Sequence, residues 1–95
     1  MKVLFYQTVH CGEVNYIIRK ELEWNRELPR IGEYVTGDAF LCAIEDEYLV
    51  EKVTHDLSEG MCFIGLAGLK ILEDCGWRDD FERHAQLAGW ECEKL

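Results

Sequence analysis

The chain has 95 residues and a formal net charge of −9, and 48% of its residues are hydrophobic. That length fits one domain, and that apolar content supports a folded core, so a disordered chain is excluded. The acidic excess opposes direct binding to nucleic acid, because the phosphate backbone repels it at long range. The longest apolar stretch, 61–72, contains Lys70 and is too short to cross a bilayer, so no membrane is expected among the direct partners.

Cysteine usage points to a reducing compartment. The N-terminus shows no secretory signal, because its apolar run is short and no small-residue cleavage site follows. The five cysteines are odd in number and unevenly spaced: Cys11, Cys42, Cys62, Cys75 and Cys92. These features are typical of free, mostly buried thiols, and we expect a cytoplasmic protein without disulfides.

The first 24 residues show the alternation of two strands. From Val3 to His10, aromatic and β-branched residues alternate between two faces, which predicts a strand. Cys11-Gly12-Glu13 supplies a turn, and 14–24 resumes the alternation with charged residues on one side. The two segments are therefore expected to pair as a hairpin. A helix over 14–24 is the alternative, because Lys, Glu and Leu also favour helices.

The middle of the chain is expected to add further strands. Pro29 and Gly32 predict a sharp turn that leads into a strand near Val35. Such entries occur in many small β-barrels, SH3-like ones among them, although this pattern is too short to identify a family. Apolar runs separated by turn residues predict three more strands: 39–44, 48–56 and 61–66.

The C-terminal third contains the only clear helical spacing. Residues 69–75 fit either a last strand or a short helix closed by Gly76. From 78 to 88 an amphipathic helix is predicted, with Asp79 and Glu82 as a capping pair at its start and Gly89 past its end. Trp90 and Cys92 alternate with acids as a final edge strand.

Together these elements predict an α+β fold. We expect an antiparallel sheet of about five to six strands, curled in one version into a partly open small barrel. The C-terminal helix, at about 78–88, would cover one face of this sheet.

The sequence offers few groups for chemistry, and no catalytic residue or cofactor is predicted. Cys75, His84 and Cys92 are the candidates for a zinc site, and Cys11 is the candidate for a reactive thiol. Structural zinc sites usually take cysteines from close pairs in tight turns, and this chain has none. A thiol- or zinc-dependent site is therefore kept as the second interpretation.

Acidic residues dominate the second half of the chain. Residues 38–60 have a net charge of −6, and residues 71–95 have a net charge of −4. Such a surface attracts a basic partner, although a solvated face that only keeps the protein soluble fits the same numbers. The candidate protein-binding residues are Glu45, Asp46, Glu47, Glu51, Asp79, Asp80 and Glu82.

The favoured function is therefore non-enzymatic binding of a basic protein surface. An inhibitor or accessory factor of bacterial or phage type would fit, and the most specific version is nucleic-acid mimicry, in which carboxylates occupy the phosphate track of a partner. A third interpretation is a structural oligomer subunit with an exposed contact among Trp24, Trp77 and Trp90. The oligomeric state is left open.

Overall fold

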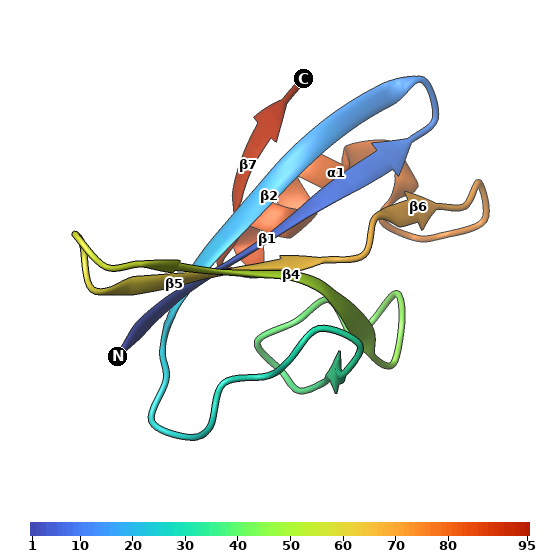
Figure 1. Ribbon diagram of the computed structural model, residues 1–95. Helices are drawn as coiled ribbons and strands as arrows, with labels where there is room; N and C mark the ends of the chain where they lie inside the picture. The colour runs from blue at the N-terminus through green and yellow to red at the C-terminus, as the bar shows by residue number, and fades with distance from the viewer.

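A computed structural model describes residues 1–95, and it contains one sheet and one short helix (Figure 1). The strands are β1 (Lys2–Cys11), β2 (Val14–Glu23), β3 (Tyr34–Val35), β4 (Tyr48–Asp56), β5 (Met61–Leu66), β6 (Leu69–Ile71) and β7 (Glu91–Lys94). A 3-10 turn, η1 (Arg78–Asp80), leads into helix α1 (Phe81–Leu87). Neither helical segment has the length and apolar character that crossing a membrane requires. The predicted α+β class is confirmed.

The sheet has seven strands, more than the five to six expected, and it is not closed. Its order is β3-β4-β5-β1-β2-β7, and β6 pairs with the far end of β1. Strand β1 is antiparallel to β2 but parallel to both β5 and β6, so the sheet is mostly rather than wholly antiparallel. The two parallel pairs arise because the chain returns from the β4–β5 hairpin along the free side of β1.

The β1–β2 hairpin confirms the strand prediction for the first 24 residues. Ten residue pairs hold it, from Lys2 opposite Glu23 to Cys11 opposite Val14. Residues 14–24 do not form the alternative helix. Alternation buries every second side chain of β1 from Val3 to Val9, which sets one face of the sheet as the core face.

Strands β5 and β6 are two parts of one track beside β1, interrupted at Ala67 and Gly68. Gln7, on β1, is 1% exposed and donates from Nε2 to the Ala67 carbonyl oxygen over 2.7 Å. This bond occupies a backbone acceptor that the interrupted ladder leaves free. The buried amide is thereby satisfied, as buried polar groups generally are.

The core lies between the sheet and the segments that fold back over it. Phe5 of β1 packs against Trp24 at a centroid distance of 5.4 Å and against Phe40 at 5.0 Å. Tyr16 of β2 packs against Phe81 of α1 at 5.4 Å. Figure 1 shows α1 on one side of β1 and β2 only, so the opposite face of the sheet has no helix over it.

Residues 39–44 were expected to be a strand and instead form turns. The Cys42 amide donates to the Phe40 carbonyl and the Ile44 amide to the Leu41 carbonyl, which closes tight turns rather than a ladder. Phe40 and Leu41 are buried nonetheless, at 7% and 2% exposure. An apolar run this short indicates that the segment is buried but does not indicate its backbone conformation. The predicted strand over 39–44 is therefore wrong, although the segment is buried.

Helix α1 ends as predicted but begins differently. Gly89 has φ of +90°, and the Trp90 amide donates to the Ala85 carbonyl, as in a Schellman cap. The predicted capping pair at Asp79 and Glu82 is wrong, because the residue before the helix is Asp80 and its side chain makes no capping bond. The Asp80 carboxylate instead accepts from Arg83 Nε at 2.8 Å.

The cysteines are free, as expected, but less buried than expected. Cys62 alone is fully buried, and the other four are half-buried. The apolar core is formed mainly by aliphatic and aromatic side chains together with Cys62, and the other four thiols lie at its margin. Side-chain packing therefore accounts for this fold without a disulfide.

Candidate functional site

The predicted acidic residues are exposed and lie on two parts of the fold. Glu45, Asp46 and Glu47 occupy the loop between β3 and β4, and Glu51 follows on β4. Asp79 and Asp80 belong to η1, and Glu82 is in the first turn of α1. None of the seven is more than partly shielded from solvent, so all of them are accessible to a partner.

The loop that bears Glu45, Asp46 and Glu47 is held in place by side chains. The Tyr48 hydroxyl donates to the Leu41 carbonyl at 2.6 Å, and the Thr36 hydroxyl donates to the Asp46 carbonyl at 2.6 Å. The Cys42 thiol lies 3.0 Å from the Gly37 carbonyl oxygen. These contacts fix the backbone of the loop, so its carboxylates project from a preorganised support.

The environment of Tyr48 shows that the loop is both packed and acidic. Burial raises the pKa of the Tyr48 hydroxyl, and the negative charge of Glu45 raises it further. The hydroxyl therefore stays protonated and keeps its bond to the Leu41 carbonyl throughout the neutral range. The anchor of the acidic loop is consequently insensitive to physiological changes in pH.

A shallow depression joins the acidic loop to the segment before η1. It has a volume of about 310 Å³, and its walls include Ile44 and Glu45 on one side and Asp74 and Cys75 on the other. Asp74 thus joins the loop carboxylates, although it was not among the predicted binding residues. Only the long-range fold brings it there, and no sequence pattern around Asp74 signals it.

The second acidic group lies near the β1–β2 hairpin. The pKa of Tyr16 is raised first by burial, then by electrostatic interactions with Cys11 and Glu82, with a smaller effect from Asp80. Tyr16 is on β2, so these acids border the end of the sheet where the hairpin turns. The structure therefore divides the predicted surface into a loop group (Glu45, Asp46, Glu47, with Asp74) and a helix group (Asp79, Asp80, Glu82), and Glu51, on β4, belongs to neither group.

Intramolecular ion pairs neutralise little of this charge. Of the seven predicted residues, only Asp80 forms one, with Arg83. The other pairs in the chain involve Glu23, Glu27 and Glu93, outside both groups. The loop group forms no ion pair within the chain, although Lys70 of β6 lines the same depression as Glu45 and Asp74.

The cysteine and histidine candidates are separated into ordinary packing environments. The His84 ring stacks on Trp77 at 5.3 Å, and the Cys11 thiol donates to the Arg78 carbonyl at 3.3 Å. Burial, assisted by Glu82, raises the pKa of the Cys92 thiol to about 11, the opposite of what a thiolate ligand requires. No three or more His, Cys, Asp or Glu side chains are grouped to hold a metal ion.

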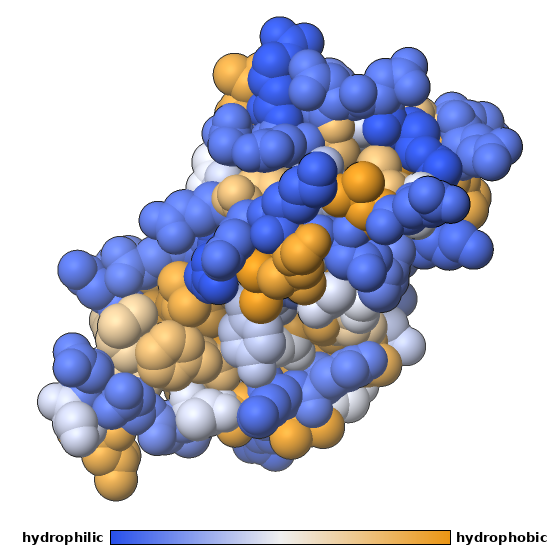
Figure 2. Space-filling view, turned by 90° about the horizontal axis from the view of Figure 1, so that it is seen from above, coloured by the Kyte–Doolittle hydropathy of each residue, from blue (hydrophilic) through white to orange (hydrophobic).

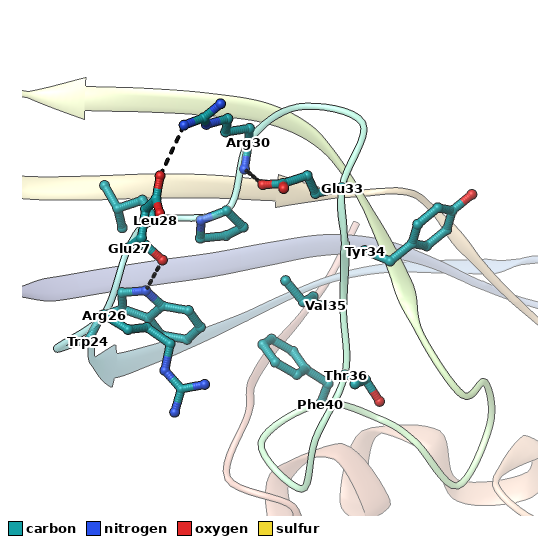
Figure 3. A pocket seen from close by; sticks show the side chains of 11 residues that line it. Trp24, Arg26, Glu27, Leu28, Arg30, Glu33, Tyr34, Val35, Thr36 and Phe40 are labelled. Atoms are coloured by element: carbon teal, nitrogen blue, oxygen red, sulfur yellow. Dashed lines mark hydrogen bonds and ion pairs between the residues drawn. The ribbon is translucent and has the colours of Figure 1, made fainter.

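A cleft with both apolar and charged walls lies at the segment that follows β2. It has a volume of about 530 Å³ and lies between the segment that follows β2 and strand β3 with the loop after it (Figure 3). Trp24 and Phe40 form its apolar part, and Arg26, Glu27, Arg30 and Glu33 supply the charges.

The charges in this cleft are mostly satisfied within it. Arg30 pairs with Glu27 at 3.0 Å, and its backbone amide donates to Glu33 at 2.6 Å. The Trp24 indole N–H donates to the Glu27 carbonyl, and Arg26 lies 5.5 Å from the Trp24 ring centre. No cysteine or histidine lines the cleft, so it lacks a thiol nucleophile and an imidazole base. No protein-family model, curated protein or solved structure matches this chain.

The surface is largely hydrophilic in the view of Figure 2, with apolar residues showing in the middle. Among the tryptophans, Trp90 is 3% exposed and belongs to the core, whereas Trp24 and Trp77 are half-buried. Trp90 is therefore not an exposed contact for oligomerisation. Of the two acidic groups, the loop group combines exposure, a fixed backbone and unpaired charge.

Proposed function

We propose that this chain is a non-enzymatic protein that binds a basic surface of another protein through the loop group. The observation that carries the proposal is the acidic loop itself. Its backbone is fixed by Tyr48, Thr36 and Cys42, and its carboxylates have no ion pair within the chain. Preorganised charge that complements a partner raises the association rate and the specificity of binding more than it raises the affinity.

The distribution of charge supports a directed partner surface. Residues 1–37 contain five acids and five bases, so the net charge of −9 arises entirely from the rest of the chain. A protein that needed charge only for solubility would gain as much from an even distribution. In the reducing cytoplasm that five free thiols fit, a basic nucleic-acid-binding groove is a frequent surface of the required sign.

Nucleic-acid mimicry is the finer form of this proposal. Glu45, Asp46 and Glu47 are consecutive, and Glu51 follows on the adjoining strand, so several carboxylates lie along one short stretch of backbone. A groove that binds successive phosphates through Lys and Arg would accept such a series. The chain would then act as an inhibitor or accessory factor that competes with nucleic acid.

The proposal is tested by affinity capture from a lysate at low and high salt. The Glu45→Lys/Glu47→Lys variant should bind its partner roughly tenfold more weakly or lose it, because two attractive charges become repulsive. The matched control is Glu13→Lys/Glu59→Lys, which changes the net charge equally at the two hairpin turns. Retention of the same partners by both variants would refute the proposal, and so would capture that is unaffected by salt.

A further inference from the structure

The face of the sheet opposite the core is apolar along its centre. On β1, Leu4, Tyr6 and Thr8 point away from the core because they alternate with the fully buried Val3 and Phe5. The residues of this outer face remain half-exposed, and no helix lies over them (Figure 1). An antiparallel sheet in contact with solvent on one side normally carries polar residues there, so this strip needs an explanation.

Strand register shows that the apolar residues are neighbours. Leu4 lies beside Phe63 of β5, and Thr8 lies beside Ile17 of β2. Between these pairs, Tyr6 lies beside Gly65, where an added Cβ would come within 2.8 Å of the tyrosine ring. The hydroxyl end of the ring therefore packs against the glycine. The apolar strip is defined as Leu4, Tyr6, Ile17 and Phe63.

Lysines lie on one side of the apolar strip and glutamates lie on the other, and Asp56, opposite Met61 at the end of β4, is an acid on the lysine side. Lys52 of β4 and Lys70 of β6 lie on the side of the face where the β4–β5 hairpin and β6 are. Glu21 of β2 and Glu91 and Glu93 of β7 lie on the other side. Glu93 is paired with Arg19, whereas neither Lys52 nor Glu91 has an ion pair within the chain.

Lys52 and Glu91 also belong to the same row across the sheet. Lys52 is opposite Gly65, Gly65 is beside Tyr6, Tyr6 is opposite Arg19, and Arg19 is opposite Glu91. Along this row the charges follow the order positive, apolar, positive, negative. The two ends of this row carry unpaired charges of opposite sign. If a second copy of the row runs in the opposite direction over the first, each positive end meets a negative end.

We propose that the outer face binds a second copy of this chain, face to face, about a two-fold axis parallel to β1. Such an axis places β4 of one copy over β7 of the other. It also places each row over the same row of the other copy, because positions along the strand direction do not change. Lys52 of each copy then meets Glu91 of the other, and the two apolar strips cover each other.

The charges also select this axis over the alternative. A two-fold axis that lies between the two sheets and runs across the strands would place β4 over β4 and β7 over β7. Lysines would then face lysines and glutamates would face glutamates, which is repulsive at both sides. Of these two isologous arrangements, only the proposed one pairs opposite charges.

The test measures self-association by light scattering and sedimentation from low to high micromolar concentration. Wild-type chain should form a dimer, and Lys52→Glu or Glu91→Lys should each weaken it about tenfold, because each reversal acts twice in a symmetric interface. The Lys52→Glu/Glu91→Lys double variant should recover wild-type affinity. Salt alone does not discriminate, since it also relieves repulsion between two chains of charge −9.

Lys94→Glu is the matched control. It changes the net charge as Lys52→Glu does, but Lys94 pairs with Tyr16 on the core side of β7, so self-association should be unaffected. Circular dichroism verifies that each variant is folded. A monomer at every concentration would overturn the proposal, and so would a dimer that neither reversal weakens. A stable complex with a different protein on this face would also overturn it.

Discussion

Gly65 shows how a single residue position shapes a whole face of this protein. The Tyr6 ring occupies the space above it, so any larger residue must displace the ring. Ring and glycine together form the centre of the apolar strip. Gln7, the next residue along β1, points the other way and ties the β5–β6 interruption to the sheet. Tyr6 therefore contributes to the outer surface, and its neighbour Gln7 contributes to the core.

Gly65→Ala should destabilise the fold by about 1–3 kcal/mol, because the new methyl group overlaps the Tyr6 ring in a packed sheet. Urea denaturation monitored by tryptophan fluorescence measures this change. Gly76→Ala is the control, since its Cβ meets nothing within 4 Å and its φ is not positive. Its effect should remain within about 0.5 kcal/mol. Equal stability of the two variants would show that Tyr6 does not pack on Gly65.

At the scale of elements, Lys20 fastens two segments to the core face of β2. Its ammonium donates to the Ala39 carbonyl at 3.0 Å and to the Ala88 carbonyl, at the C-terminal end of α1, at 2.9 Å. It also lies 5.7 Å from the centre of the Trp90 ring. A cation at a helix C-terminus is favourable because it meets the negative end of the helix dipole. Lys20 therefore couples α1 to the loop after β3.

Lys20→Met should lower stability by about 1–2 kcal/mol at neutral pH, since the apolar stem remains but both hydrogen bonds are lost. Lys94→Met, which removes no such bond, is the control. Thermal and urea unfolding provide the measurement. A loss no larger than that of the control would show that Lys20 does not fasten these segments.

The same variant has a defined pH dependence. Burial lowers the pKa of Lys20 below its ordinary value of 10.5. Below the folded-state pKa the lysine is charged in both states, so the cost of burying the charge is fully present. As pH rises from there towards 10.5, the folded protein loses this proton before the unfolded chain does, and the cost is released. The stability advantage of wild type over Lys20→Met should therefore widen over that range, and a narrowing would contradict the shift.

At the scale of the whole molecule, uncompensated charge is the dominant property. Only four of the nineteen carboxylates form ion pairs, and all four pairs are at the surface. Surface pairs contribute at most about 1 kcal/mol each, whereas self-repulsion acts among all the remaining acids. The same surplus that would attract a basic partner therefore works against the folded state.

Moderate salt should accordingly stabilise the isolated protein, because screening reduces repulsion more than it weakens four exposed pairs. Urea midpoints measured at low and at physiological ionic strength test this, with sodium chloride as the salt. The midpoint should rise with salt and level off once the charges are screened. A midpoint that falls over this range would mean that the ion pairs outweigh the repulsion.

Local patterns predicted much of this fold and rather less of its site. Alternation identified β1, β2, β4 and β5, and helical spacing identified α1, because these patterns depend only on neighbours along the chain. The acidic content of 38–60 and its exposure also followed from sequence. The turn structure of 39–44 did not, since burial of Phe40 and Leu41 depends on contacts made by distant strands.

What the sequence determined by itself is the alternation of apolar and charged residues and the sign of the surface, both properties of short segments. Only the tertiary structure decided that β5 and β6 run parallel to β1, that Asp74 lies near Glu45, and that Lys52 and Glu91 end one row. The physical reason is that these relations join residues far apart in the chain. They form when the chain between such residues closes into a loop and both ends pack in the same core. No local sequence pattern shows which of the possible loop closures has the lowest free energy.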